Sequence, residues 1–460
     1  MYLERERISL NIHLYKMFFV SMNGILFITV DCLRSDHMGC YGYNRPTTPN
    51  IDSLAESGTL YKNSYANCPS TRWAFQSLHT GISAVQIDGI GVPNECETLA
   101  SKLLSKGYET GWFGINAFVS REYCYQKGFN KFYGIKDTIP KQSFIYKVGK
   151  QIHNSLNSEF IYNHIINPVY KKLYRRSQLK TGRYRPPNPD KQTVDRALDF
   201  INDKLNNSNF LCWVHFMDAH TPYGRYPKHL QAIRGDTSIE HVIKPHDEGK
   251  ADQPHESVID TYDACIRNVD EQVGRLLDRV PEETMVVLTG DHGEEFGRYQ
   301  PHHRHSMYSS YTQVPIIIRD KGLPNSRKES PAQHLDLMPT ILRRANIKIP
   351  DYFEGIQLQD EKRTKKEPIY FGFDRERGAI RIGDWKYMDY PDPELYNTPH
   401  SGIDGEPVTE QYPDKTSELR GLLEEYRSSP MVGKGKSNIY SNDNKISETI
   451  EENLEDLGYL

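Results

Sequence analysis

Residues 24–31 read Gly-Ile-Leu-Phe-Ile-Thr-Val-Asp, a nearly continuous apolar run that ends in an aspartate. A run of this length and composition is typical of a strand that is buried on both faces of a sheet. Asp31 at its end needs a partner or a cation, because burying a lone carboxylate is costly. The run therefore predicts a central strand that carries a polar group at its carboxyl end.

The same alternation of apolar runs and amphipathic segments continues along the chain. We expect strands at 111–118, 210–217, 284–289 and 314–318, and helices at 51–58, 96–106, 193–205, 257–279 and 416–427. This order predicts an α/β fold, with a mostly parallel central sheet, helices on both faces and a small C-terminal α+β subdomain. In such sheets the ligand site lies outside the carboxyl ends of the strands.

Composition narrows the class of protein. The chain has 460 residues, of which 37% are hydrophobic and 26% charged, and its net charge is −4. These values exclude a disordered or collagen-like chain and argue against a globally basic nucleic-acid binder. The seven cysteines are odd in number and lack metal-finger spacing, which predicts a reducing compartment, the cytoplasm, and no disulfide framework.

The expected organisation is a leader (1–23), a catalytic domain (24–345) with a basic insertion (140–190), and a C-terminal subdomain with a charged tail (346–460). Met17 or Met22 are alternative start residues. No apolar run reaches the ~18–20 residues that a membrane-spanning helix needs. The segment from Lys171 to Arg185 holds seven basic residues and no acid. It is either a solvated insertion or a rim that attracts an anionic substrate.

Residues 290–297, Gly-Asp-His-Gly-Glu-Glu-Phe-Gly, place a carboxylate and an imidazole directly after a predicted strand. Asp291 and His292 suit a divalent metal, although a helix cap and an ordinary loop histidine are the alternative. Asp31 would join them if its strand neighbours the strand at 284–289. A further cluster is either a metal or anion site or a polar surface loop, and it comprises His302, His303 and His305.

Thr71 is expected at the N-terminus of a helix, in the segment Cys-Pro-Ser-Thr-Arg (68–72). Backbone N–H groups and the helix dipole favour an alkoxide or a bound anion there. A hydroxyl that also contacts a metal is an activated nucleophile, whereas the plainer alternative is an N-cap threonine. Arg72 is a natural partner for an oxyanion.

With these residues in place, the chain resembles the sulfatases of the alkaline-phosphatase-like superfamily almost end to end. The resemblance rests on residues 27–37 (FITVDCLRSDH), 48–52 (TPNID), 218–223 (DAHTPY), 291–293 (DHG), 385–387 (WKY) and 394–396 (ELY). It implies the fold of that superfamily and a metal-dependent hydrolase of sulfo- or phospho-esters.

Departures from the family pattern point to a threonine-nucleophile variant. Sulfatases carry a Cys or Ser, oxidised to formylglycine, in a Cys/Ser-x-Pro-x-Arg motif, and here Pro69 stands one place early. The family nucleophile lies nine residues before the Thr of a Thr-Gly pair, and that position before Thr80 is Thr71. Cys32 replaces the family's second aspartate, and Asn116 replaces a lysine. In this respect the chain resembles the phosphodiesterase and phosphotransferase branches of the superfamily, in which threonine nucleophiles occur.

The resemblance implies roles for individual residues. The implied metal ligands are Asp31, Thr71, Asp291 and His292, with Asp218, His220, and His303 or His305 as second-site ligands or leaving-group contacts. The implied catalytic residues are Thr71, Arg72 and His220, and the implied substrate contacts are Arg72, Asn116, His303 and His305. The histidines favour Zn or Mn as the divalent cation, whereas the likeness to sulfatases favours Ca.

The leading functional prediction is therefore a metal-dependent sulfate-ester hydrolase that acts through a threonine. A phosphodiesterase, phosphomonoesterase or phospho-headgroup transferase of the same superfamily is the alternative, and a non-catalytic binder that keeps the fold is the second alternative. The expected partner is a small anionic ester, such as a sulfated or phosphorylated glycan, with no nucleic acid and no integral membrane segment. The sequence makes no prediction of oligomeric state.

Overall fold

The computed structural model describes residues 24–134, 189–205, 208–221, 223, 226–235, 256–296, 306–359, 363–399 and 404–434. The expected leader, nearly all of the 140–190 insertion with its basic segment, and the tail beyond residue 434 lie outside the described residues. The domain boundaries that were placed in those regions therefore remain a proposal.

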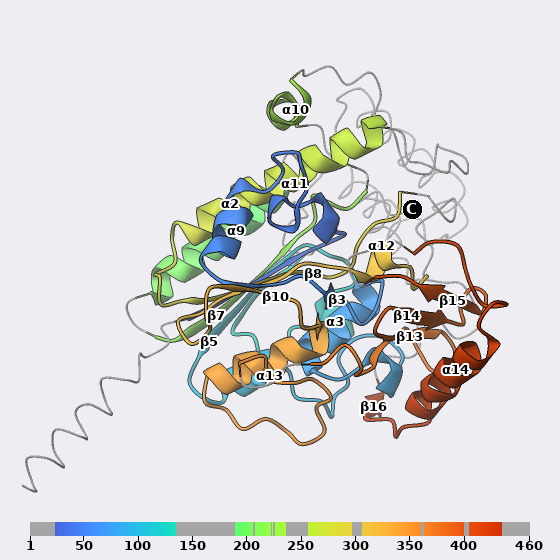
Figure 1. Ribbon diagram of the computed structural model, residues 1–460. Coiled ribbons are helices and arrows are strands. Elements are labelled where there is room, and N and C mark those ends of the chain that lie inside the picture. Colours follow the sequence, from blue (N-terminus) through green and yellow to red (C-terminus); the bar gives the residue numbers. More distant parts are fainter. Residues whose placement is uncertain are drawn as a thin grey trace, which may run out of the picture.

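An eight-stranded sheet forms the centre of the molecule (Figure 1). Its strand order is β10 (Ser326–Lys328), β2 (Thr59–Tyr61), β9 (Ile316–Arg319), β8 (Met285–Gly290), β1 (Gly24–Val30), β7 (Phe210–Phe216), β5 (Glu109–Phe113) and β6 (Lys131–Tyr133). The pairs β8–β1, β1–β7, β7–β5, β5–β6 and β10–β2 are parallel, and β9 is antiparallel to both of its neighbours. The predicted mostly parallel sheet is confirmed, and β1 lies at its middle.

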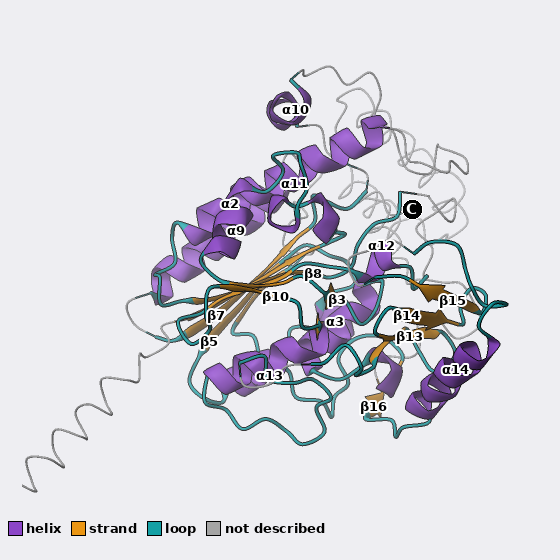
Figure 2. Cartoon of the chain, viewed as in Figure 1, coloured by secondary structure: helices purple, strands orange, loops and turns teal. Residues whose placement is uncertain are grey.

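Successive residues of β1 feed two different apolar cores, because side chains alternate across a strand. Ile25 and Phe27 join one core, and Leu26, Ile28 and Val30 join the other. The first core is covered by α3 (Thr71–Thr80), α4 (Leu99–Leu104) and α13 (His334–Arg344), and the second by α2 (Pro49–Glu56), α9 (Pro189–Lys204) and α11 (Glu256–Leu277) (Figure 2). Helices thus cover both faces of the sheet, as the sequence predicts.

The C-terminal region adds a separate antiparallel sheet of β12 (Ile369–Gly372), β13 (Gly378–Ile382), β14 (Trp385–Met388) and β15 (Glu394–Asn397). Helix α14 (Pro413–Arg427) packs Leu419 and Leu423 against this sheet. The predicted small α+β subdomain and its charged helix are confirmed. Shorter elements are β3 (Ser64–Tyr65) with β11 (Ala332–Gln333), β4 (Ile87–Asp88) with β16 (Gly433–Lys434), α10 (Pro227–Arg234) and α12 (Ser309–Thr312).

All seven cysteines lie within the described residues and none forms a disulfide, in agreement with the sequence prediction. Among the described residues, no helix is both long enough and apolar enough to cross a membrane.

Candidate active site

The carboxyl ends of β1 and β8 place two aspartates on the side of the sheet that α3 covers. Thr29 of β1 lies in register with Thr289 of β8. Asp31 and Asp291 each follow two residues later, and residues two apart along a strand share a face. Both carboxylates are fully buried. The predicted meeting of these two strand ends is confirmed.

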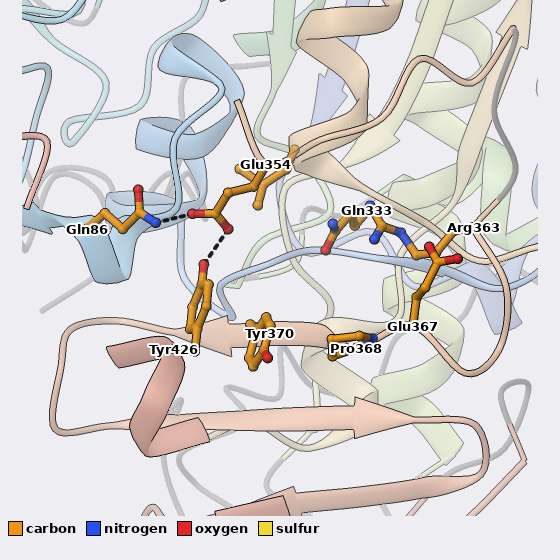
Figure 3. Close-up of a pocket in the computed structure, with 9 residues that line it drawn as sticks. Gln86, Gln333, Glu354, Arg363, Glu367, Pro368, Tyr370 and Tyr426 are labelled. Carbon is orange, nitrogen blue, oxygen red and sulfur yellow. Dashed lines mark hydrogen bonds between the residues drawn. The ribbon is translucent and has the colours of Figure 1, made fainter. Parts of the chain in front are cut away.

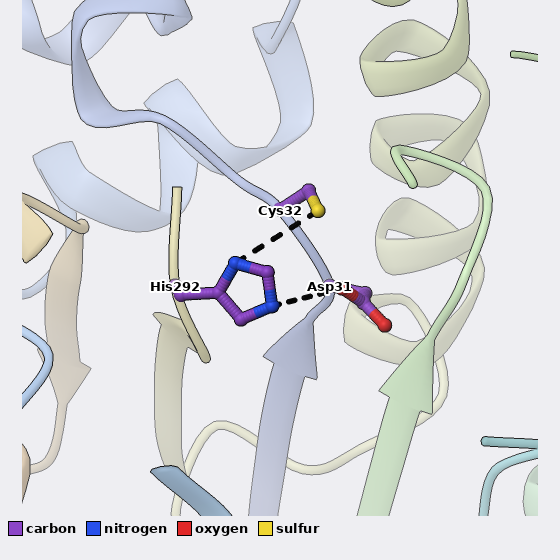
Figure 4. Close-up of side chains that lie close together, drawn as sticks. All are labelled: Asp31, Cys32 and His292. Atoms are coloured by element: carbon purple, nitrogen blue, oxygen red, sulfur yellow. Dashed lines mark hydrogen bonds and ion pairs between the residues drawn. The ribbon is translucent and has the colours of Figure 1, made fainter. Parts of the chain in front are cut away.

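The turn after β8 directs His292 toward Asp31. The backbone N–H of His292 donates to Asp291 Oδ1 (2.7 Å), and its Nδ1 bonds the Gly293 carbonyl (2.8 Å). Because a carbonyl only accepts, Nδ1 carries a proton, so Nε2 is the nitrogen that has a lone pair in the neutral ring; it faces Asp31 Oδ1 at 3.5 Å (Figure 4). A side chain at Gly293 would meet the Ser310 carbonyl oxygen at 2.0 Å, so this tight turn requires glycine.

Helix α3 brings Thr71 to the same place. The helix begins at Thr71, as the sequence predicts, and the Thr71 hydroxyl lies 3.2 Å from Nε2 of His292. The dipole of the helix favours negative charge at this end. Cys68, by contrast, lies fully buried in the apolar core, where burial raises the pKa of its thiol well above the ordinary value.

Asn116 contacts Asp31, whereas Arg72 contacts an aromatic ring. The Asn116 amide donates from Nδ2 to Asp31 Oδ2 (3.0 Å), and its Oδ1 accepts from the backbone N–H of Phe118 (2.8 Å). Asn116 is fully buried in the loop that follows β5, which ends at Phe113. Its predicted contact with the ester remains a prediction. The Arg72 guanidinium stacks 4.0 Å from the centre of the Phe118 ring.

The structure describes two of the predicted second-site residues, Asp218 and His220. Asp218 accepts a hydrogen bond from Asn268 of α11 (2.6 Å), and it belongs to neither group of metal-ligand side chains found among the described residues. His220 bonds the Thr221 carbonyl through Nδ1, and its charge acts on Asp31. Three further histidines lie outside the described residues: His302, His303 and His305.

The two buried aspartates have opposite electrostatic environments. Burial alone would raise the pKa of Asp31, but the imidazoles of His220, His215 and His292 outweigh it and hold that pKa well below its usual range. Burial and the neighbouring charge of Asp31 raise the pKa of Asp291. His292, His215 and Thr71 lower the pKa of Asp291 as well, but they offset that rise only in part.

The donor set fits a divalent cation. The structure groups Asp31 with Cys32 and His292, and Asp31 with His215 and Asp291, with the potential ligand atoms of each group within 4.8 Å of one another. Oδ2 of Asp291 is buried and accepts no hydrogen bond from any described residue. A positive ion bound there would compensate a buried carboxylate oxygen in that state. Carboxylates combined with imidazole suit Zn or Mn.

His215 is the residue of this cluster that the sequence prediction missed. It lies inside the apolar run of β7, is fully buried, and its Nε2 is 3.8 Å from Asp31 Oδ2. The available signal was a lone imidazole within an otherwise apolar strand, next to the strand that ends in Asp31.

A cavity of about 410 Å³ lies apart from this cluster (Figure 3). Glu354 is at its side, where it accepts hydrogen bonds from Gln86 and Tyr426, and the Tyr426 ring stacks 3.8 Å from Tyr370. Its lining includes none of the candidate site residues Asp31, Thr71, His215, Asp291 and His292. The cavity is therefore not part of the candidate active site.

The chain is similar in sequence and in fold to several known proteins. The chain is 25% identical over 411 residues to the uncharacterized sulfatase YidJ of Escherichia coli, covering 79% of this chain and 77% of that protein. The structure of Ps i-CgsB in complex with k-i-k-neocarrahexaose has a TM-score of 0.63 at 18% identity and covers 94% of this chain and 96% of that one. The phosphonate monoester hydrolase of Agrobacterium radiobacter gives 0.61 at 16% identity, covering 93% and 98%.

These likenesses establish a common fold. The sequence profile described as Sulfatase matches residues 24–347, which span both aspartates, Thr71 and His292. That match covers most of the chain and includes every strand of the central sheet. The chain therefore belongs to the sulfatase family.

Proposed function

We propose that this sulfatase-family chain is a metal-dependent hydrolase of sulfate esters in which Thr71 is the nucleophile. The observation that carries the proposal is the 3.2 Å contact between the Thr71 hydroxyl and Nε2 of His292, at the N-terminus of α3. Asp31, Asp291 and His292 are the residues that would hold the cation. When bound, a divalent cation would stabilise negative charge on the attacking oxygen and on the ester.

The chain's own groups then account for the two halves of the reaction. In the first, a bond forms from Thr71 Oγ1 to the sulfur while the bond from the sulfur to the leaving alcohol oxygen breaks, and the Thr71 hydroxyl proton passes to solvent. We assign to His220, which is buried and lowers the pKa of Asp31, the proton that the leaving alcohol receives. In the second, water attacks the sulfur, the bond from the sulfur to Thr71 Oγ1 breaks and sulfate leaves. One proton of that water restores the Thr71 hydroxyl and the other returns to His220. The N-terminus of α3 favours the negative charge that develops in both halves.

A phosphate or phosphonate ester is the second candidate substrate, together with transfer of a phospho-headgroup. The observation that favours it is the unmodified hydroxyl of Thr71 where formylglycine sulfatases have Cys or Ser. The fold likeness to a phosphonate monoester hydrolase is compatible with this alternative. Retention of Asp31, Asp291 and His292 in one buried cluster argues against a non-catalytic binder.

The substrate class that we propose is a small anionic ester, with a sulfated or phosphorylated glycan as the natural form. Imidazole beside carboxylates favours Zn or Mn over Ca. The cytoplasmic location predicted from the cysteines remains a prediction.

A panel of nitrophenyl esters tests the reaction class. The full chain is loaded with Zn or Mn and assayed against the sulfate, phosphate, phosphodiester and phosphonate esters. Turnover of the sulfate with the highest kcat/KM supports the leading proposal, and preference for the phosphodiester or phosphonate selects the alternative. A fully metal-loaded, folded protein that turns over none of them contradicts both.

A further inference from the structure

The two oxygens of the Asp31 carboxylate face different sets of groups. Oδ1 faces His292 Nε2 at 3.5 Å, on the side where Thr71 lies. Oδ2 faces away from that contact, toward the Asn116 amide at 3.0 Å and His215 Nε2 at 3.8 Å. One oxygen is thus directed at the proposed cation site, and the other at two buried side chains.

Neighbouring strands hold His215 in this position. Thr29 and His215 are register partners on β1 and β7, and Thr29 Oγ1 lies 3.1 Å from His215 Nδ1. The ring also packs edge-on against Phe75, with ring centres 4.8 Å apart. His215 is fully buried, its Nε2 approaches Asp31 Oδ2 at 3.8 Å, and it helps to lower the pKa of Asp31. The ring is therefore fixed at one end and directed at Asp31 with the other.

Asp31, more than Thr29, indicates the tautomer of His215. Trp213 Nε1–H donates to Thr29 Oγ1 (3.1 Å). The Thr29 hydroxyl proton is within reach of both His215 Nδ1 (3.1 Å) and the Val214 carbonyl (3.4 Å). An ionised Asp31 carboxylate only accepts, so the tautomer that suits the 3.8 Å approach of Nε2 to Oδ2 carries its proton on Nε2 and accepts from Thr29 at Nδ1.

We infer that His215 is a positioning residue: with Asn116 it fixes the orientation of Asp31, so that Oδ1 is presented to the cation. This inference rests on the proposed metal-dependent function and extends it to a residue that contacts neither substrate nor nucleophile. Groups that hold a ligating carboxylate are known to matter for affinity, and losing one typically weakens metal binding about 10- to 100-fold.

The test measures Mn²⁺ and Zn²⁺ dissociation constants by calorimetry on the full chain after removal of metal with a chelator. His215→Phe keeps a ring of similar shape but removes both nitrogens, and we expect it to weaken binding about 10- to 100-fold. His215→Gln returns an N–H near the position of Nε2 and should recover most of that loss. Thr29→Val leaves His215 in place but removes the hydroxyl that lies 3.1 Å from its Nδ1, so it should weaken binding by a smaller factor.

His79 supplies a matched control. It is also a fully buried histidine, it packs against the same Phe75 ring, and it stacks 4.2 Å from Trp213, but none of its contacts within the described part of the chain is with Asp31. His79→Phe should therefore leave both dissociation constants unchanged. Equal losses in His79→Phe and His215→Phe would overturn the inference, because they would reflect damage to the shared aromatic core.

The outcomes also separate this inference from the proposed function. A folded His215→Phe that binds both ions as tightly as the parent overturns the positioning role alone. If His215→Phe does not fold, unchanged binding by Thr29→Val overturns it in the same way. A parent chain that binds neither ion overturns the metal-dependent function, and with it the inference.

Discussion

The Thr71 hydroxyl lies 3.2 Å from Nε2 of His292, although 221 residues of chain separate the two. Two independent features of the fold create this contact: α3 begins at Thr71, and the turn after β8 bonds Nδ1 of His292 to the Gly293 carbonyl. The hydroxyl is thereby presented to the one ring nitrogen that keeps a lone pair. This is the geometry on which the proposed chemistry depends.

Metal removal is expected to abolish activity. Stripping the chain with a chelator should leave Asp31 and Asp291 without the cation that the proposed reaction needs, and adding back single ions should restore turnover with Zn or Mn ahead of Ca. The measurement is kcat/KM with each ion, together with metal content. Full activity in verified metal-free protein would contradict the proposal.

Cys32→Asp should shift metal preference toward Ca. Cys32 adopts a left-handed backbone (φ 58°), which aspartate tolerates better than most residues, so the change is compatible with the fold. Its thiol lies 3.9 Å from His292 Nδ1. Replacing soft sulfur with hard oxygen should lower the Ca dissociation constant relative to that of Zn, by about tenfold or more.

Cys32→Ser is the control for that change, since it removes the thiol without adding a carboxylate. The ratio of the two dissociation constants should move toward Ca only in the aspartate variant. Identical ratios in both variants would show that a carboxylate at residue 32 does not reach the cation.

The chain should lose stability as the pH falls below 6.5, in part because of His79. Burial, with a smaller contribution from His215, lowers the pKa of His79 to about 3. Between pH 6.5 and 3 the unfolded state binds a proton that the folded state does not, so the free energy of unfolding decreases as the pH is lowered. From pH 7 to 5 this one group should cost about 2 kcal/mol. Denaturant unfolding at both pH values measures it.

His79→Phe should reduce that acid sensitivity, since phenylalanine can stack on Trp213 but cannot take up a proton. The difference in unfolding free energy between pH 7 and pH 5 should shrink by about 2 kcal/mol. An unchanged pH dependence would place the acid-sensitive groups elsewhere.

Removing the charge of Asp404 should destabilise the contact between the C-terminal sheet and α12. Lys386 of β14 is fully buried and donates to Asp404 Oδ2 (2.8 Å), while Ser309 of α12 donates to Oδ1 (2.8 Å). Asp404→Asn leaves the ammonium of Lys386 buried without a counter-ion, which typically costs about 3–5 kcal/mol. Thermal or denaturant unfolding is the measurement.

An exposed ion pair of similar length serves as the control for Asp404. Lys321 and Glu283 are 2.7 Å apart, but their side chains are 43% and 35% exposed. Glu283→Gln should leave stability unchanged, because solvent screens such pairs. Equal effects of the two substitutions would show that Lys386 is not held by Asp404.

The fold was largely predictable because its core strands are continuous apolar runs. Such a run indicates burial on both faces, which fixed β1, β7 and β8 and hence the site at their carboxyl ends. The direction of β9 was not predictable, since a buried strand has the same pattern whether it runs parallel or antiparallel. Its antiparallel pairing with β8 is visible only in the structure.

The candidate site was predictable only where a reactive side chain directly follows a strand or stands at the first position of a helix. Asp31, Asp291, His292 and Thr71 meet those conditions, and the structure brings them together. The role of Asn116 was not predictable, because it depends on where β5 ends and on which side chain the amide then reaches. His215 was missed because it stands inside an apolar run, and its importance depends on its register with Thr29.

The most direct test of the account compares Thr71 with Cys68. The measurement is kcat/KM on the best nitrophenyl ester for folded, metal-loaded Thr71→Ala and Cys68→Ala. We expect Thr71→Ala to lose several orders of magnitude, as removal of a covalent nucleophile does in other hydrolases. Cys68→Ala should retain most activity, because it removes only a small side chain from the apolar core. An inactive Cys68→Ala beside an active Thr71→Ala would contradict the account and assign the chain to the formylglycine sulfatases.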